Sequence, residues 1–443
     1  MIFTKAPPSG EILVSYCAKE SSEFFAIIYP AKKEELKVEK ADQTTFVLQN
    51  SPVLEGSGSV SKNGTTVELK NDFPKKGQSS AVLTPGLGLN DTKVTVTYNP
   101  VFRSVLAGEV KPCTNFGEFK KHFGDFTADE NQNRLAHAVY GFFNNGGTRC
   151  YVARVENEAK VEAVLEKFEA IDEIAIVAAP GLVEDSTRTA IVSHCEKMED
   201  RFAVLDSKEM DISQSLTKEE IKPPAPTNYA AFYFPRIKVF DPVTKAMDPK
   251  GDGQILVPPS GHIAGIYARV DASRGVHKAP ANEVVRGALG LERLVSRSQQ
   301  EGLNPDGINC IRDLNDNIRV WGARTIGGDG NGEWKYINVR RLFLFLRESI
   351  DEGLQWTVFE PNDSALWAKI RRNITAFLMN VWRSGALFGA TPQDAFYVKC
   401  DEETNPPEVR DLGQVVTEIG VAVVKPAEFV IFKISQWAGP SGG

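Results

Sequence analysis

The chain has 443 residues, a formal net charge of −7 and an isoelectric point near 5.5. At roughly 150 residues per domain, this length predicts about three domains. The 42% hydrophobic and 25% charged residues are typical of a soluble globular protein and exclude a disordered or fibrous one. The acidic balance argues against nucleic acid as a partner, because such binding needs clustered lysine and arginine. No apolar run approaches a membrane helix and no secretory signal begins the chain, so we expect no direct membrane insertion and synthesis in a cytosol.

The six cysteines are isolated from one another, and no two form a CxxC pair. This spacing fits neither a zinc site nor a disulfide framework. We predict that all six are reduced and that most are buried: Cys17, Cys113, Cys150, Cys195, Cys310 and Cys400.

The first hundred residues are rich in strand and turn signals. Asn63-Gly64 separates two alternating segments, as in a type I′ β-hairpin. We predict an N-terminal segment at 1–20, followed by a β-rich domain at 21–98.

The next part of the chain, 99–235, alternates apolar strands with amphipathic helices. Asn115 and Glu118 have the spacing of a helix N-cap, and a later helix is expected to end at the glycines of the run 144–147. Strands that alternate with helices predict βαβ units and a largely parallel sheet. The fold class is therefore α/β, or α+β overall once the β-rich domain is included.

The C-terminal half carries the strongest helical patterns. Residues 241–262 hold turn formers and few apolar positions, which predicts an exposed hairpin or long loop. The core at 263–424 includes two amphipathic helices, at 336–354 and 362–384. The glycine-rich stretch 326–334 is predicted to be a flexible connection.

No residue pattern indicates catalysis. Asp206 ends an apolar strand, but no glycine-rich loop for a pyrophosphate precedes it, so we predict a strand-end cap rather than a ribose ligand. The histidines lack metal-ligand spacing; we expect His137 at the surface or half-buried, and His262 and His277 in a polar loop region. We therefore predict no catalytic residue, no cofactor and no metal site. An α/β enzyme or ligand-binding protein without a recognisable motif is the alternative.

Longer stretches carry a more specific signal. They include NFGEFKKHFG at 115–124, LAHAVYGFFNNGGTRCYVARV at 135–155, PPSGHIAGIYARVDASRGVHKAPANE at 258–283, NPDGINCIRDLNDNIRVWGARTI at 304–326, WKYINVRRLFLFLRESIDEGLQWTVFEPND at 334–363 and EIGVAVVKPAEFVIFKISQW at 418–437. In these stretches the chain resembles the contractile tail sheath proteins of phage tails, phage-tail-like bacteriocins and extracellular contractile injection systems. The N-terminus lacks the family's usual PGVYVEE-like arm, so either GEILVSY is a strongly divergent arm or the N-terminus is rebuilt.

The resemblance implies a structural subunit that polymerises around an inner tube and contracts to drive the tube through a target envelope. The implied partners are copies of itself in stacked hexameric rings, an inner tube protein, and baseplate and cap proteins. The implied location is a phage tail or injection particle that is assembled in a bacterial cytoplasm, including particles that are later released. A specialised sheath-like protein at the baseplate or cap end is the alternative. The sheath body would occupy 99–424 and a C-terminal arm 425–443.

The expected contacts between subunits lie near the C-terminus. The apolar segment is hydrophobic on both faces, as suits a strand that completes a neighbour's sheet, with an ordinary internal strand as the alternative. The predicted inter-subunit strand contains Glu428, Phe429, Val430, Ile431, Phe432, Lys433, Ile434 and Trp437. The predicted hinge consists of Lys425, Pro426 and Ala427. Charges that exchange partners between packing states are predicted at Arg340, Arg341, Arg347, Glu348, Asp351, Glu352, Asp363, Arg371, Arg372 and Arg383.

Overall fold

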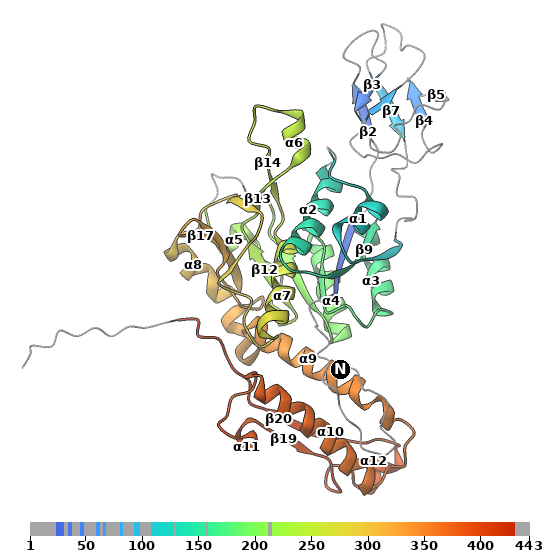
Figure 1. The fold of residues 1–443 in the computed structure, drawn as a ribbon, viewed down its shortest axis with the longest axis vertical. Helices are drawn as coiled ribbons and strands as arrows, with labels where there is room; N and C mark the ends of the chain where they lie inside the picture. Colours follow the sequence, from blue (N-terminus) through green and yellow to red (C-terminus); the bar gives the residue numbers. More distant parts are fainter. Residues whose placement is uncertain are drawn as a thin grey trace, which may run out of the picture.

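The computed structural model describes seven short strands between residues 24 and 97 by their backbone. It describes the chain with its side chains over 108–127, 130–155, 158–210 and 215–429, those of residues 130 and 131 excepted. Figure 1 shows small N-terminal sheets, a central α/β body and a helical C-terminal unit, which α9 joins to the body.

A nine-stranded sheet forms the middle of the body, in the order β15-β18-β17-β12-β11-β10-β1-β9-β8. The six strands from β17 to β9 in this order run parallel, whereas β8 pairs antiparallel with β9, β18 with β17, and β15 with β18. The predicted α/β class is confirmed. The strands are β1 Phe24–Pro30, β8 Val110–Cys113, β9 Arg149–Val155, β10 Ile176–Ala178, β11 Phe202–Asp206, β12 Ala230–Phe234, β15 Glu283–Val284, β17 Ile308–Leu314 and β18 Asn317–Val320.

Strand β1 belongs to the sheet of the body, not to the N-terminal domain in which it was expected. It lies between β9 and β10, with Phe24 opposite Arg149 and Ile27 opposite Ala178. The β-rich domain expected at 21–98 therefore gives its first strand to the body. The sequence of β1, FFAIIYP, fits this place, because a central parallel strand is covered on both faces and reads as a continuous apolar run.

The other N-terminal strands form two small antiparallel sheets, β2-β7-β4-β5 and β3-β6. Strands β4 and β5 place Lys62 opposite Thr65, as the predicted hairpin requires, while Asn63 and Gly64 lie outside the described residues. The strands are β2 Glu34–Lys37, β3 Thr45–Val47, β4 Ser59–Lys62, β5 Thr65–Val67, β6 Ser80–Val82 and β7 Lys93–Thr97.

Helices cover both faces of the body sheet. Val152, Ile176 and Val204 point into one hydrophobic core, and their neighbours Ala153 and Val177 point into the other. The first core lies under α1 Phe116–Phe123, α2 Glu130–Asn144 and α7 Ser260–Arg274, and the second lies under α3 Val161–Glu169 and α4 Asp185–Met198. This alternation buries both faces, as a parallel sheet requires.

The segment 241–262 was predicted to be exposed, but its last residues are buried in the first turn of α7. Strands β13 Ile237–Phe240 and β14 Gln254–Val257 do form a hairpin, with α6 Pro242–Met247 at its tip and β16 Ala288–Leu291 beside β13. Ser260 to His262, however, are buried in α7. Gly261 explains the close packing, because a Cβ there would lie 2.4 Å from the carbonyl oxygen of Ala138 in α2.

The C-terminal unit confirms both predicted helices, as α9 Ile337–Leu354 and α10 Ser364–Arg383. Their apolar stripes pack with the two-stranded sheet of β19 Phe396–Lys399 and β20 Glu418–Val421. Residues 326–334, expected to be a flexible connection, instead contain the 3₁₀ helix η3 Gly328–Trp334. The remaining helices are η1 Glu158–Lys160, α5 Lys218–Ile221, α8 Arg297–Leu303, η2 Asn304–Asp306, η4 Gln355–Thr357, α11 Pro392–Ala395 and α12 Pro407–Asp411.

Candidate functional site

The segment that follows β20 returns from the C-terminal unit to the body. Val423 forms a β-bridge with Leu387, and the amide of Val424 donates to the carbonyl of Ala386 over 3.3 Å. Four residues later, the carboxylate of Glu428 contacts the body. The segment is therefore attached at both ends before the apolar run begins.

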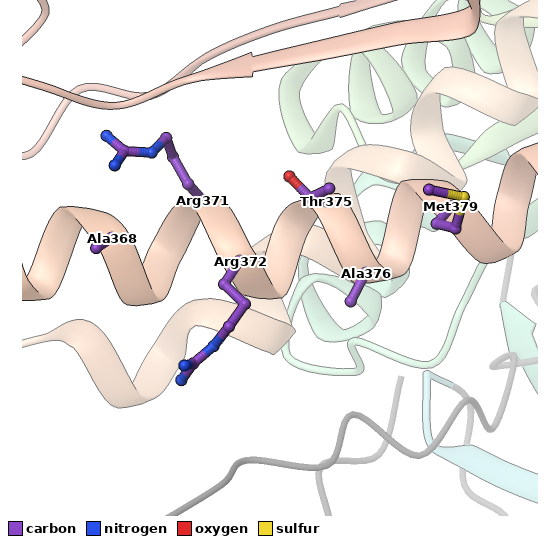
Figure 2. Close-up of a pocket in the computed structure, with 6 residues that line it drawn as sticks. All are labelled: Ala368, Arg371, Arg372, Thr375, Ala376 and Met379. Carbon is purple, nitrogen blue, oxygen red and sulfur yellow. The ribbon is translucent and has the colours of Figure 1, made fainter. Parts of the chain in front are cut away.

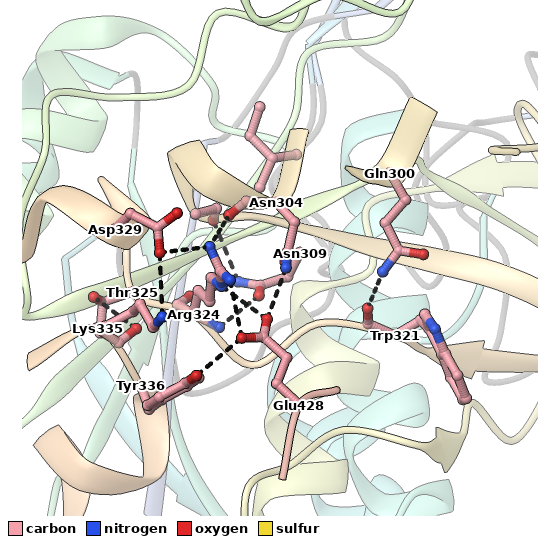
Figure 3. A network of polar contacts seen from close by, with 12 residues as sticks. Gln300, Asn304, Asn309, Trp321, Arg324, Thr325, Asp329, Lys335, Tyr336 and Glu428 are labelled. Atoms are coloured by element: carbon pink, nitrogen blue, oxygen red, sulfur yellow. Dashed lines mark hydrogen bonds and ion pairs between the residues drawn. The ribbon is translucent and has the colours of Figure 1, made fainter. Parts of the chain in front are cut away.

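Glu428 accepts four hydrogen bonds at this point (Figure 3). Arg324 donates to both carboxylate oxygens, from Nε over 2.8 Å and from Nη2 over 2.9 Å. Asn304 Nδ2 donates to Oε1 over 2.7 Å, and the hydroxyl of Tyr336 donates to Oε2 over 2.9 Å. The side chain of Arg324 is 4% exposed and that of Glu428 is 18% exposed, so water competes little for this two-point ion pair.

The fold holds Arg324 firmly in place. Its backbone amide donates to Asn309 Oδ1 over 2.8 Å, and Asn309 Nδ2 donates to the carbonyl of Arg324 over 2.8 Å. Nη1 also donates to the carbonyl of Asn304 over 3.0 Å and to Asp329 over 3.1 Å. Since Asn309 lies in β17, the guanidinium that binds Glu428 is fixed to the body sheet.

The electrostatics of the site favour the charged forms of both partners. Burial alone would raise the pKa of Glu428, but the hydrogen bonds from Arg324, Asn304 and Tyr336 outweigh burial and leave this pKa below its ordinary value. Burial likewise opposes the charge of Arg324, yet the contacts with Glu428 raise its pKa above the ordinary value. The pair is therefore ionised at neutral pH.

The structure places only part of the predicted arm. Glu428 is held by the body, and Phe429 is 68% exposed. The predicted strand residues beyond these two lie outside the described residues: Val430, Ile431, Phe432, Lys433, Ile434 and Trp437.

The structure describes the three residues of the predicted hinge. Lys425, Pro426 and Ala427 lie between two attachments, at Val424 and at Glu428. The hinge predicted at these three residues therefore lies in a short stretch that is held at both ends.

The sheet of β19 and β20 is the described β-structure nearest to this segment in the sequence. It has two strands, with Tyr397 opposite Gly420 and Val398 opposite Ile419. The ring of Tyr397 lies across Gly420, where a Cβ would come within 2.1 Å of it. A two-stranded sheet is marginal by itself and gains stability from further strands.

The predicted interface charges separate into inner and outer groups. Arg341 is buried and forms a two-point ion pair with Asp271 in α7, so it is paired within its own subunit rather than at the surface. Asp363 caps α10 by accepting from the amide of Leu366 over 2.8 Å. Arg340 stacks on Tyr229, with 3.7 Å between the guanidinium and the ring centre.

Four of the other charges come together in a cleft between the body and the C-terminal unit. Arg347, Glu348, Asp351 and Glu352 line it from α9, opposite side chains of the body and of β20: Asp172, Met198, Asp200 and Ile419. Arg347 also pairs with Glu199. The cleft is predominantly acidic.

Arg371 and Arg372 project from α10 to different sides of a shallow hollow (Figure 2). The shallow hollow there is lined by residues of this one helix only: Ala368, Arg371, Arg372, Thr375, Ala376 and Met379. Arg371 donates to the carbonyl of Cys400, while Arg372 and Arg383 are exposed. Because a single helix lines the hollow, it is an open surface rather than an enclosed ligand pocket.

The residues tested for catalysis have structural surroundings. Asp206 ends β11, is buried, and accepts from Ser260 N over 2.8 Å and from Ser260 Oγ over 2.6 Å, so its carboxylate binds the first residue of α7. His137 and His262 are both buried, contrary to the positions expected from the sequence. His137 Nε2 lies 2.9 Å from Asp241 Oδ1.

Within the described part of the chain, no three histidine, cysteine or acidic residues are grouped as a metal site would need. In the same residues, no helix has the length and apolar character to cross a membrane. The five cysteines that the structure describes are free and buried: Cys113, Cys150, Cys195, Cys310 and Cys400.

The sequence did not reveal the partners of Glu428. Arg324 and Asn304 are separated from it by 104 and 124 residues, and Tyr336 by 92. The one signal in the sequence is a lone carboxylate directly before an apolar run, which favours an anchor at that point.

Comparisons with known proteins cover the larger part of the chain. Residues 155–326 match the phage tail sheath protein central domain, and residues 329–436 match the phage tail sheath C-terminal domain. The tail sheath protein of Vibrio phage KVP40 is 30% identical over 190 residues, covering 42% of this chain and 27% of that protein. The tail sheath protein of Burkholderia phage BcepMu is 27% identical over 208 residues, covering 45% and 41%. The match thus spans less than half the length of these curated relatives.

Solved structures match over a larger share. A chain of the PVC sheath complex, an extracellular contractile injection system in its contracted state, is 30% identical with a TM-score of 0.65, covering 75% of this chain and 88% of that one. A chain from the baseplate of the anti-feeding prophage is 30% identical with a TM-score of 0.62 and the same coverage. Because it matches nearly the full length of these relatives in both sequence and fold, the chain belongs to the contractile tail sheath protein family.

Proposed function

We propose that this chain is the structural subunit of a contractile sheath. In this role it polymerises with its own copies, in stacked hexameric rings around an inner tube, and contracts to drive the tube through a target envelope. The observation that carries the proposal is the 30% identity and TM-score of 0.65 to a chain of a contracted sheath complex, over 88% of that chain.

The apolar C-terminal segment supplies the proposed link between subunits. Residues 429–437 are apolar on both faces, and Glu428, directly before them, is anchored to the body. We propose that this segment adds as a strand to the β19–β20 sheet of a neighbouring copy. Strand addition satisfies the backbone groups of the segment and enlarges a two-stranded sheet that is marginal alone.

The proposed contraction also needs contacts that exchange between two packings of rigid subunits. The exposed and half-buried charges of α9 and α10 are the candidates: Arg347, Glu348, Asp351, Glu352, Arg371, Arg372 and Arg383. Each exposed pair contributes only about 0.2–1 kcal/mol. Their effect is proposed to arise from repetition over many identical subunits.

The proposed partners in the particle are an inner tube protein and the baseplate and cap proteins. The particle is proposed to assemble in a bacterial cytoplasm as a phage tail or injection device. One observation favours a second candidate, a sheath-like subunit at the baseplate end, because a similar chain comes from the anti-feeding prophage baseplate.

Expression of the full chain with its neighbouring tail proteins tests the proposal. Negative-stain microscopy should show tubular sheaths that sediment rapidly. A small closed oligomer at all protein concentrations would contradict it and would favour a ligand-binding or enzymatic protein. Sheath caps limited to one end of a tube would favour the baseplate-end candidate.

A further inference from the structure

Three separate parts of the body contact Glu428, the residue directly before the apolar C-terminal segment. Asn304 lies in the 3₁₀ helix η2, Arg324 follows β18, and Tyr336 directly precedes α9. All three donate hydrogen bonds to Glu428. Glu428 is also the last acidic residue of the chain, and the apolar run begins immediately after it.

We propose that Arg324 and Glu428 form a positioning clamp, which fixes where and in which register the C-terminal segment leaves its own subunit. The inference rests on the proposed function, since it assumes that residues 429–437 bind a neighbouring copy. The clamp acts on the segment and does not itself contact the neighbour.

Register is the first quantity that the clamp controls. Side chains of a strand alternate between two faces, so a shift of one residue moves every side chain to the opposite face. In a strand, Phe429 and Ile431 would lie on one face and Val430 on the other, and two parallel hydrogen bonds from one guanidinium to Glu428 would set which face is which. A single bond would leave rotation about its axis, which the bidentate geometry removes.

Reach is the second quantity. The proposed strand segment has nine residues beyond Glu428, 429–437, and thirteen beyond the preceding attachment at Val424, 425–437. The effective concentration of a tethered strand falls as roughly the −3/2 power of tether length, so opening the clamp weakens each contact about twofold through length alone. A sheath contains many such contacts, and small losses at each therefore add up.

The clamp also determines where a pull on the segment is transmitted. Asn309 joins the backbone of Arg324 to β17, and its Nδ2 lies 3.2 Å from the carbonyl of Phe232 in β12. Tyr336 forms a β-bridge with Arg324 and begins the approach to α9. A neighbour that moves the segment therefore moves the body sheet and α9 together.

Substitutions of Glu428 and of Tyr336, one of its hydrogen-bond donors, test whether these contacts position the segment or only stabilise the fold. Glu428→Gln removes the charge and keeps the shape, and Tyr336→Phe removes one donor. Glu301→Gln is the matched control, because Glu301 is an exposed carboxylate that pairs only locally with Arg297, over 3.0 Å. All variants are full-length and are measured for sedimenting sheaths, sheath length and melting temperature.

We expect Glu428→Gln to lower the yield of sheaths several-fold and Tyr336→Phe to lower it less, with melting temperatures close to wild type and Glu301→Gln unchanged. Wild-type yield and length in Glu428→Gln would overturn the proposal. A loss of sheaths that disappears when assembly is carried out well below the melting temperature would also overturn it, because the contact would then serve stability alone.

A glycine inserted between Glu428 and Phe429 tests register directly. In the wild-type background the insertion flips the faces of the strand and should abolish sheaths. In the Glu428→Gln background the insertion should cause little further loss of sheaths, because Arg324 no longer fixes the start of the segment. Independent, multiplicative effects of the two changes would contradict the clamp.

Truncation after Glu428 separates this inference from the proposed function. The truncated chain keeps the clamp and lacks the segment, so it should form no sheaths. If it forms normal sheaths, the strand-addition proposal fails and the clamp with it. If it forms none while Glu428→Gln matches wild type, only the clamp fails.

Discussion

Arg341 and Asp271 form a buried ion pair between α9 and α7, with Nη1 to Oδ1 at 3.0 Å and Nη2 to Oδ2 at 2.6 Å. The guanidinium also lies over the ring of Tyr267, 4.7 Å from its centre. The hydroxyl of Tyr267 is 2.7 Å from that of Tyr233 in the body sheet. The pair therefore fastens the first half of α9 to the body, and α9 carries the C-terminal unit.

The first prediction concerns this pair. Asp271→Asn should lower the free energy of unfolding by about 3–5 kcal/mol, because it leaves a buried guanidinium without its counter-charge. Replacing both partners, as Asp271→Leu with Arg341→Met, should cost much less. Urea denaturation of the full chain measures both. Arg347→Met, which removes an exposed charge, is the control and should change stability by less than about 1 kcal/mol. An equal loss in the single and double variants would contradict the interpretation.

The second prediction concerns His262 and mild acid. Burial, and to a lesser degree His137, lowers the pKa of His262 to about 3. The unfolded chain takes up this proton near pH 6.5 and the folded chain does not. Stability should therefore fall by about 1.4 kcal/mol per pH unit as the pH drops below 6.5.

The variant His262→Phe keeps the ring shape and removes this titration. The facing groups are His137, which is paired with Asp241, and the backbone of Gly141. Urea midpoints at pH 7.5, 6 and 5 should decline less steeply in this variant than in wild type. His122→Asn, at a half-exposed position in α1, should keep most of the decline. Parallel pH profiles for wild type and His262→Phe would refute the prediction.

The third prediction concerns acid and the clamp. Because the folded pKa of Glu428 lies below its ordinary value of about 4.5, the clamp's contribution is complete above that pH and is lost as the pH falls through the lower, folded value. Sheath yield should therefore show a loss below about pH 4.5 that depends on Glu428. Glu428→Gln should lack this component. The charged and titratable groups around Glu428 are Arg324 and Tyr336, with Asp329 and Lys335 behind them. An identical loss of sheath yield at low pH in wild type and in Glu428→Gln would contradict the assignment of this loss to Glu428.

The fourth prediction concerns the buried thiols. Burial raises the pKa of Cys310 to about 12 and also raises the pKa values of Cys150 and Cys195. In a Cys17→Ser variant, which removes the cysteine outside the described residues, Ellman's reagent should titrate no thiol in the native chain and five in urea. Rapid reaction of any thiol without urea would show that one of the cores opens readily.

Local patterns allowed much of this fold to be predicted. The helices α9 and α10, the cap at Asn115 and the strands of the body follow from periodicity and capping chemistry, which act over a few residues. The place of β1 did not follow, because an apolar strand carries no mark of the sheet it joins. The burial of His262 was also missed, since it depends on a close approach of two helices.

The candidate site could be predicted only in part. The apolar segment after Glu428 was visible in the sequence, but its attachment depends on partners about a hundred residues away. Arg341 was expected among surface charges because a helical pattern gives the face of a residue and not the partner that covers it. Asp271 supplies that partner from another helix.

The most direct test of the account is sheath formation by the full chain and by the chain truncated after Glu428, measured side by side by sedimentation and negative-stain microscopy. The account predicts long sheaths from the full chain and monomers or small oligomers from the truncated chain, with similar melting temperatures. Sheaths of normal length from the truncated chain would contradict it.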